Sequence, residues 1–265
     1  MKVEAITLYP VKATRGVPVE SAEVELSGLR HDRRWAVVDL EGRRLNATHH
    51  GSLLAVTAAP GDDGSIVLGA AGLDPLPVPV PSGGPRIPVN VSRLPEMIDA
   101  GEAAAAWFTS YLGLPTRLVW QDDPAARTIA PGHGGTQDEP LNLADAGPLL
   151  LTSAASLTQL NEWIGDEEMA MLRFRPNVVV DGDVPFAEDD WSRIRLGDVD
   201  YRFAERCDRC VVTTIDPDSL HHGKEPIRTL ARHRKWDGKT WFGIRIVPLG
   251  TGTLAVGDAV HVTTG

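Results

Sequence analysis

The two cysteines of this 265-residue chain stand close together, as Cys207-Asp208-Arg209-Cys210. An iron–sulfur cluster usually takes four thiolates and a closed structural zinc site needs four protein ligands, so the pair alone builds neither. Cys210 follows Arg209 and lies four positions after Arg206. Neighbouring cations favour the thiolate form of a cysteine. Cys210 is therefore a candidate nucleophile or soft-metal ligand, and a single thiolate among hydrogen-bond donors suits a metal that arrives inside an organic cofactor.

Three other interpretations of the cysteine pair stay open. Free cysteines pack as small apolar side chains, so both thiols can be structural. The second interpretation is a dithiol redox pair of the thioredoxin type. Such a motif is normally followed by a helix, but the run 211–215 predicts a strand here. Zinc is the third, with His221, His222 and His233 as further ligands at a spacing that matches no finger or ribbon.

Basic residues gather at several places in a chain with 36 acidic and 26 basic residues and a formal charge of −10. This charge works against a surface that follows nucleic acid or anionic lipid, so an anionic ligand needs a local basic pocket. Arg173 and Arg175 would share one face if they alternate on a strand, where guanidinium groups can bind phosphate. We predict that Lys12, Arg33 and Arg175 converge on one pocket near Cys210. The wider set of candidates is Lys12, Arg15, Arg30, Arg33, Arg34, Arg43, Arg44, Arg173, Arg175, Arg206 and Arg209.

A carboxylate, Asp145, precedes an apolar run and follows Leu143-Ala144. In that position it can lie at the rim of a cavity and move a proton, or it can be a turn aspartate.

Short strands are expected to position the basic residues of the first part of the chain. A helix is predicted between Gly101 and Gly113 from its alanines and its terminal glycine. A hairpin is predicted around Gly61–Gly64, and the prolines between 75 and 95 limit that stretch to edge strand or loop. The expected strands are 3–11, 22–26, 35–40 and 53–58.

Residues 121–140 are rich in Asp, Pro and Gly and have no period, which predicts a linker or functional loop between domains at 1–120 and 141–265. A buried strand at 148–152 and a helix at 154–164, capped by Ser153, are expected to open the second domain. Mostly strands with about three helices, without strict alternation, predicts an α+β, mostly β fold of barrel type. The remaining expected elements are strands at 177–180, 194–203 and 211–215, a helix at 225–234, and a final strand pair at 242–249 and 253–262.

Short motifs in one order along nearly the whole chain carry a family resemblance. They are Tyr9-Pro-Val-Lys12, Gly16-Val-Pro-Val19, Asp32-Arg33 before Trp35, Gly101–Trp107, Leu151–Leu157, Arg173-Phe-Arg-Pro-Asn177, Glu188-Asp-Asp-Trp191, Cys207–Cys210, Thr213–Asp218 and Val256-Gly-Asp258. With these motifs the chain resembles the MOSC proteins, named for the C-terminal domain of molybdenum cofactor sulfurase, in the branch that contains the mitochondrial amidoxime reducing component.

The resemblance implies an N-terminal β-barrel-like domain and a MOSC β-barrel domain, with a molybdenum–molybdopterin cofactor in the cleft between them. It also implies that Cys210 ligates the molybdenum and that Asp145 stands near the metal as a second catalytic residue. The remaining residues that it assigns to the cofactor site are Lys12, Arg33, Arg175, Asn177 and Arg209.

The chain departs from the pattern of these relatives at four positions. Ala13 and Thr48 replace a serine and an arginine, and Ala146 and Gly147 replace hydroxyl residues beside the aspartate. Fewer phosphate and oxo contacts are expected from these changes, with three consequences left open: weaker cofactor retention, a different substrate choice, or compensation by His49, His50 or Arg30.

The activity implied by the resemblance is a molybdenum-dependent reduction of N-hydroxylated compounds, such as amidoximes, hydroxylamines and N-hydroxylated bases. The sequence has no dinucleotide fingerprint and no cluster ligands beyond its two cysteines, which implies a separate ferredoxin, flavoprotein or haem protein as electron donor. Without a leader or an apolar run of about 18 residues, we expect a soluble, cytoplasmic protein with no membrane or nucleic-acid partner. The alternative is a carrier of molybdenum cofactor or of persulfide sulfur, which turns over no external substrate.

Overall fold

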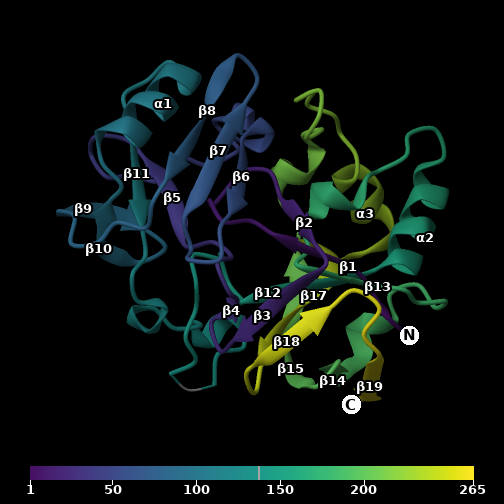
Figure 1. Ribbon diagram of the computed structural model, residues 1–265. Helices are drawn as coiled ribbons and strands as arrows, with labels where there is room; N and C mark the ends of the chain where they lie inside the picture. The colour runs from purple at the N-terminus through teal and green to yellow at the C-terminus, as the bar shows by residue number, and fades with distance from the viewer. Residues whose placement is uncertain (137) are drawn as a thin grey trace.

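A large curved sheet contains strands from both ends of the chain in the computed structural model, which describes residues 1–136 and 138–265 (Figure 1). Within these residues its strand order is β19-β14-β15-β17-β12-β13-β1-β2, and β16 pairs with β17. β12 and β13 pair in parallel orientation. β13 also pairs with β1, and β1 pairs with β2, both in antiparallel orientation. The bounds are β1 (Val3–Leu8), β2 (Val17–Val19), β12 (Leu149–Ser153), β13 (Val178–Val180), β14 (Trp191–Leu196), β15 (Val199–Asp208), β16 (Lys235–Trp236), β17 (Lys239–Pro248) and β19 (Val260–Thr264).

Three smaller sheets complete the β structure of the described residues, in the orders β5-β11-β10-β9, β6-β7-β8 and β18-β3-β4. The predicted hairpin around Gly61–Gly64 is confirmed as β6–β7. The proline-rich stretch forms β8 and β9 at sheet edges and the start of β10, because a proline cannot donate to a central ladder. The bounds are β3 (Ser21–Glu25), β4 (Gly28–Leu29), β5 (Trp35–Val38), β6 (Thr57–Pro60), β7 (Ile66–Ala70), β8 (Leu73–Val78), β9 (Arg86–Val91), β10 (Leu94–Asp99), β11 (Arg117–Trp120) and β18 (Gly252–Ala255).

Two large apolar cores lie under these sheets, so the α+β, mostly β architecture predicted from the sequence is confirmed. One core combines Val3, Ile6 and Leu8 of β1 with Leu151 and Ile244 of the second half. The other core lies between α1 and the two small sheets β5-β11-β10-β9 and β6-β7-β8. The strands β1, β3 and β4 therefore pack with residues 149–262, and the interval 1–120 contributes to both cores.

The α-helices of the described residues are α1 (Glu102–Leu112), α2 (Ala154–Ile164) and α3 (Ile227–His233), close to the expected ranges. Figure 1 shows α1 on one side of the molecule and α2 and α3 on the other. Gly113 ends α1 in the left-handed region, with φ of 69°. The predicted side-chain cap of α2 is wrong, since Ser153 occupies the N-cap position but its hydroxyl makes no cap bond. No helix in the described part of the chain is long and apolar enough to cross a membrane.

Some predicted strands are wrong. The segment 53–58 divides between a 3-10 helix, η1 (Gly51–Ala55), and β6. The segment 194–203 is a hairpin, β14–β15, because Gly197 turns the chain with φ of 56°. The strands β17 and β18 do not pair with each other: β18 pairs with β3, and β19 pairs with β14.

The run after Cys210 is a 3-10 helix, η6 (Val211–Thr214), and not the predicted strand. The hydroxyl of Thr213 donates to the Cys210 carbonyl at 3.0 Å, and that of Thr214 to the Val211 carbonyl at 2.7 Å. These local bonds give the backbone an alternative to a ladder, which overrides the strand preference of β-branched residues.

Candidate functional site

A cavity of about 310 Å³ lies between the two halves of the chain, at the lower end of the range of small-molecule sites. The predicted convergence of Lys12, Arg33 and Arg175 near Cys210 is confirmed, since all four line this cavity. Its walls include all of the predicted site residues, namely Lys12, Arg33, Asp145, Arg175, Asn177, Arg209 and Cys210.

Lys12 and Arg44 meet on one carboxylate oxygen at the first wall of the cavity. Lys12 Nζ donates to Asp145 Oδ1 at 2.7 Å, and Arg44 Nη1 donates to the same oxygen at 3.0 Å. Burial lowers the pKa of Lys12 to about 8, although Asp145 opposes this shift. Lys12 in turn lowers the pKa of Asp145 well below its usual range, with a further contribution from Arg44. Asp145 is therefore an ionised carboxylate that orients two cations, and near neutral pH it has no proton to donate.

The loop that carries Asp145 is fixed by an arginine from the segment 121–140. Arg127 is 5% exposed, and its guanidinium donates to the carbonyls of Asn142, Ala144 and Asp145. Burial lowers the pKa of Arg127 to about 10, so it keeps its charge at neutral pH. Charged donors on three carbonyls hold this loop in one shape. Composition alone does not distinguish Arg127 from a solvated surface arginine.

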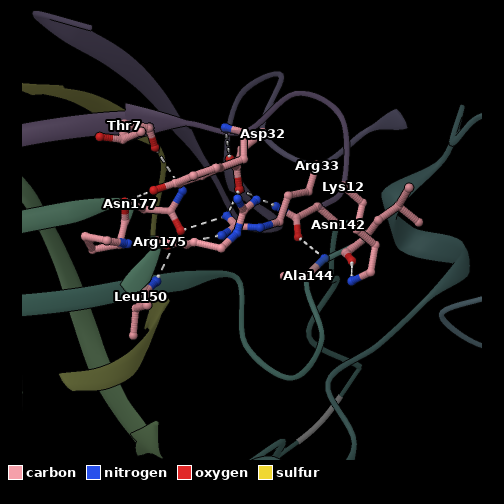
Figure 2. Close-up of polar contacts among 12 residues, drawn as sticks. Thr7, Lys12, Asp32, Arg33, Asn142, Ala144, Leu150, Arg175 and Asn177 are labelled. Atoms are coloured by element: carbon pink, nitrogen blue, oxygen red, sulfur yellow. Dashed lines mark hydrogen bonds and ion pairs between the residues drawn. The ribbon is translucent and has the colours of Figure 1, made fainter. Parts of the chain in front are cut away.

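Arg33 reaches the cavity through a polar network at the start of the large sheet, as Figure 2 shows. Its Nη1 donates to Asn177 Oδ1 at 2.9 Å and also pairs with the buried carboxylate of Asp32. Asn177 Nδ2 donates to the Thr7 carbonyl at 3.2 Å, and its Oδ1 also accepts from the Leu150 amide at 3.2 Å. Asn177 thus ties Arg33 to two strands, β1 and β12, and its amide is used within the protein.

Arg175 stands beside Arg33, and both guanidinium groups lie over the ring of Tyr9, at 4.3 and 4.6 Å from its centroid. Arg175 donates to the Thr14 carbonyl, and burial lowers its pKa to about 10. Burial also raises the pKa of Tyr9 to about 12, so the ring stays neutral beneath the two cations.

Arg173 and Arg175 do not alternate on a strand, and that prediction is wrong. Arg173 is in a 3-10 helix, η4 (Met171–Phe174), and Arg175 follows it in the left-handed region with φ of 57°. Arg173 donates to Asp216 at 2.8 Å, and its Nε is buried without a hydrogen-bond partner. Both arginines nevertheless line the cavity, because the tight turn brings them to the same wall.

The two cysteines occupy different environments along this cavity. Cys210 is exposed at the N-cap position of η6, whereas Cys207 is 5% exposed. Both are free thiols that line the wall. No cluster of histidine, cysteine, aspartate and glutamate in the described residues could hold a metal ion, which contradicts the zinc interpretation.

Arg209 is held between the cysteines by backbone carbonyls. Its Nε and Nη2 donate to the Phe242 carbonyl at 2.8 and 2.6 Å, and Nη1 donates to the Phe174 carbonyl at 3.0 Å. Gly243 lets β17 approach β12 closely, because a Cβ there would lie 2.7 Å from the Leu151 carbonyl oxygen. Arg209 is thus a fixed cation next to the exposed thiol.

Arg245 is a cavity residue that the sequence did not indicate, and Arg44 is one that only the wider set of basic candidates included. Arg245 pairs with Glu205 and donates to Asp208 at 3.0 Å. Gly147 makes room for it, since a Cβ at 147 would lie 2.9 Å from Arg245 Cβ.

The four positions that depart from the relatives, Ala13, Thr48, Ala146 and Gly147, all line the cavity. The expected compensation by Arg30 is wrong, since Arg30 pairs with Glu23 on the surface and does not line the described cavity. The described lining does not include His49 or His50 either, whereas Arg44 lines the same cavity as Thr48.

The lining is strongly cationic in a protein of formal charge −10. An anionic group with phosphate oxygens fits this donor set, because guanidinium and ammonium groups are the usual phosphate-binding donors. The exposed Cys210 offers a soft ligand at the same cavity. The charged members of the wall are Lys12, Arg33, Arg44, Arg173, Arg175, Arg209 and Arg245, with the carboxylates Asp145 and Asp208.

Two family models match the chain: the MOSC N-terminal beta barrel domain over residues 1–115 and the MOSC domain over residues 138–261. "Mitochondrial amidoxime-reducing component 1" of Homo sapiens is 35% identical, over 98% of this chain and 82% of that protein. "Mitochondrial amidoxime reducing component 2" of Rattus norvegicus is 33% identical over the same shares. "Molybdenum cofactor sulfurase" of Danio rerio is 28% identical, over 89% of this chain and 31% of that protein.

Proposed function

We propose that this chain is a molybdenum cofactor-dependent reductase of N-hydroxylated compounds. The premise is that it belongs to the family of MOSC domain proteins with an N-terminal MOSC β-barrel domain. The observation that carries the proposal is the cavity, in which an exposed thiol and a set of cations meet. The names of the two amidoxime-reducing relatives support the reaction class.

Two groups of residues would hold the cofactor. Arg175, Arg33 and Lys12 suit its phosphate, because they combine buried positive charge with hydrogen-bond donors. Cys210 would supply the thiolate ligand, beside the fixed cation Arg209. When bound, the molybdenum supplies two-electron redox chemistry to the substrate.

Reduction of an amidoxime consumes two electrons and two protons, breaks the N–O bond, and releases an amidine and water. The Lys12 ammonium, with a pKa of about 8, is the group at the first wall that can give up a proton near neutral pH. Asp145 holds that ammonium in place through Oδ1. We therefore assign the proton to Lys12 Nζ and an orienting role to Asp145.

The electrons are proposed to come from a separate protein. This chain has two cysteines, both in one motif, and no dinucleotide-binding fingerprint. A ferredoxin, flavoprotein or haem protein would be oxidised as the N–O bond breaks.

Activity of protein purified from a cofactor-competent host tests the proposal. We expect about one molybdenum per chain, reduction of benzamidoxime with reduced viologen, and no turnover with NADH alone. Mass measurement of the extracted pterin would identify the mononucleotide or dinucleotide form. Molybdenum-loaded protein that fails to reduce any N-hydroxylated compound with viologen would contradict the reductase assignment. Sustained NADH-dependent turnover without a carrier would contradict the separate electron donor.

A carrier of cofactor or persulfide sulfur is the second candidate, because the free thiols Cys207 and Cys210 line one cavity. A persulfide releases thiocyanate when treated with cyanide. Stoichiometric thiocyanate from protein without reductase activity would favour the carrier, and its absence from active protein would favour the enzyme.

A further inference from the structure

A segment near the C-terminus reverses the charge of the rest of the chain. Residues 224–241 contain six lysines and arginines but only two acidic residues, Glu225 and Asp237, in a protein of formal charge −10. The segment comprises α3, β16 and the first residues of β17. The basic residues are Lys224, Arg228, Arg232, Arg234, Lys235 and Lys239.

Most of this segment faces solvent, and part of its charge is uncompensated. Arg228 pairs with Glu225, and Lys239 lies 3.5 Å from Asp208. Within the described residues, Lys224, Arg232 and Lys235 have no carboxylate within ion-pair distance, and all three are exposed. These three cations are therefore free to attract a negatively charged partner.

An exposed tryptophan stands among these cations and is fixed by its neighbours. Trp236 is 36% exposed, and its ring stacks on Trp241 at a centroid distance of 5.8 Å. The guanidinium carbon of the buried Arg234 lies 5.1 Å from the centroid of the Trp236 ring and 4.0 Å from that of Phe186. A large side chain that is ordered before binding loses little conformational freedom at an interface.

The segment adjoins the thiol end of the cavity. The amide of Arg209 donates to the Thr240 carbonyl at 2.8 Å, and the Thr240 hydroxyl donates to the Arg209 carbonyl at 3.2 Å. η6, which follows Cys210, packs against α3. Val211, the residue after the exposed thiol, is itself 52% exposed. The exposed Val211 and the exposed cation Arg232 thus lie on two elements that pack against each other, η6 and α3.

We propose that Arg232, Lys235, Trp236 and Val211, here called the basic–aromatic surface, dock a small acidic electron-carrier protein beside Cys210. The inference rests on the proposed reductase function and adds the place of electron delivery. Positive charge on this surface complements the carboxylates of such a carrier and speeds encounter. Trp236 and Val211 supply the apolar contacts of the small interface that is usual for transient redox pairs.

A folded acidic protein fits this surface better than a polyanion does. Three exposed cations without an ion pair within the described residues, Lys224, Arg232 and Lys235, lie on one short segment, while the remaining surface of a protein of charge −10 repels an extended nucleic acid or an anionic bilayer. The exposed tryptophan and valine beside the cations are typical of the centre of a protein interface.

Charge reversal tests the surface in the molybdenum-loaded full chain. The donor is whichever of an acidic ferredoxin, a flavodoxin or an acidic haem carrier, each with its reductase, gives the highest kcat/KM. In the double variant Arg232→Glu/Lys235→Glu we expect a drop of about tenfold or more in kcat/KM for that carrier, mostly in KM, and loss of its salt dependence. Trp236→Ala should weaken binding of the oxidised carrier, measured by surface plasmon resonance, by about tenfold.

The matched control is Arg193→Glu/Arg195→Glu, the same charge change at exposed positions of β14. It should leave carrier-driven turnover within about twofold. Turnover with reduced viologen, a small cation that needs no basic surface, should be unchanged in every variant.

Each other outcome has a separate meaning. Loss of viologen-driven reduction in the wild type contradicts the proposed function itself. If viologen turnover is normal and the two double variants have the same kcat/KM with the carrier, the docking surface is overturned. It is also overturned if the enzyme turns over with viologen but with none of the acidic carriers. The docking surface is also overturned if Arg232→Glu/Lys235→Glu abolishes binding to DNA or to phosphatidylserine vesicles but leaves carrier kinetics intact.

Discussion

The two walls of the cavity hold their cations in different ways. At one wall, Lys12 and Arg44 share the carboxylate of Asp145. At the other, Arg175 and Arg209 donate to backbone carbonyls. A carbonyl satisfies an N–H group without cancelling the charge, whereas a carboxylate neutralises one cation. The carbonyl wall is therefore the stronger anion site, and the carboxylate wall is the part whose charge changes with pH.

The largest expected effect concerns the thiol beside the carbonyl wall. Cys210→Ser should remove nearly all molybdenum and N-reductive activity, about tenfold or more, because serine supplies no soft thiolate. Cys207→Ser, at the buried thiol, should be far milder. Metal analysis and circular dichroism would separate loss of metal from loss of fold. Equal loss of metal in both variants would mean that the pair acts as a chelate or a dithiol.

An intermediate effect compares one arginine from each wall. Arg175→Met should weaken binding of the cofactor by about tenfold more than Arg44→Met, because the Arg175 charge has no carboxylate partner to offset it. Binding of pyrophosphate to cofactor-free protein, followed by calorimetry, measures the difference directly. Equal losses, or a greater loss in Arg44→Met, would show that a carboxylate-paired cation binds anions as well as a carbonyl-bound one.

The sequence predicts most of the cavity but not the partners of its residues. Short motifs identify Lys12, Arg33, Asn177 and Cys210, because each motif is local. Nothing local distinguishes Arg44 from its neighbour Arg43, since its pairing depends on Asp145, which lies 101 positions away. Arg127 falls in a segment whose composition predicts a linker. The strand expected after Cys210 fails for a local reason, since threonine hydroxyls bond to their own backbone there.

The smallest effect is a pH dependence of the carboxylate wall. Lys12 has a pKa of about 8, so anion affinity should fall about threefold between pH 7 and pH 9 as its proton leaves. The folded-state pKa is below that of an unfolded lysine, so the unfolded chain binds more protons between pH 8 and about 10, and this residue makes the free energy of unfolding rise with pH. A loss of anion affinity between pH 8 and about 10 therefore does not come from unfolding caused by the deprotonation of Lys12.

Pyrophosphate titrations of wild type and Lys12→Met across this range provide the measurement. The variant should bind more weakly at pH 7 and show a flat profile. A wild-type profile that persists in Lys12→Met would assign the titration to another group.

The pairing of β3 with β18 determines the order in which the protein can fold during synthesis. Ser21–Glu25 hydrogen-bonds with Gly252–Ala255, and the Val3 amide donates to the Asp258 carbonyl. During synthesis, the first strands leave the ribosome long before their partners exist, and such distant pairings form slowly. The two cavity walls can meet fully only after residues 252–258 have emerged. Loading of any cofactor between them therefore follows the synthesis of residues 252–258.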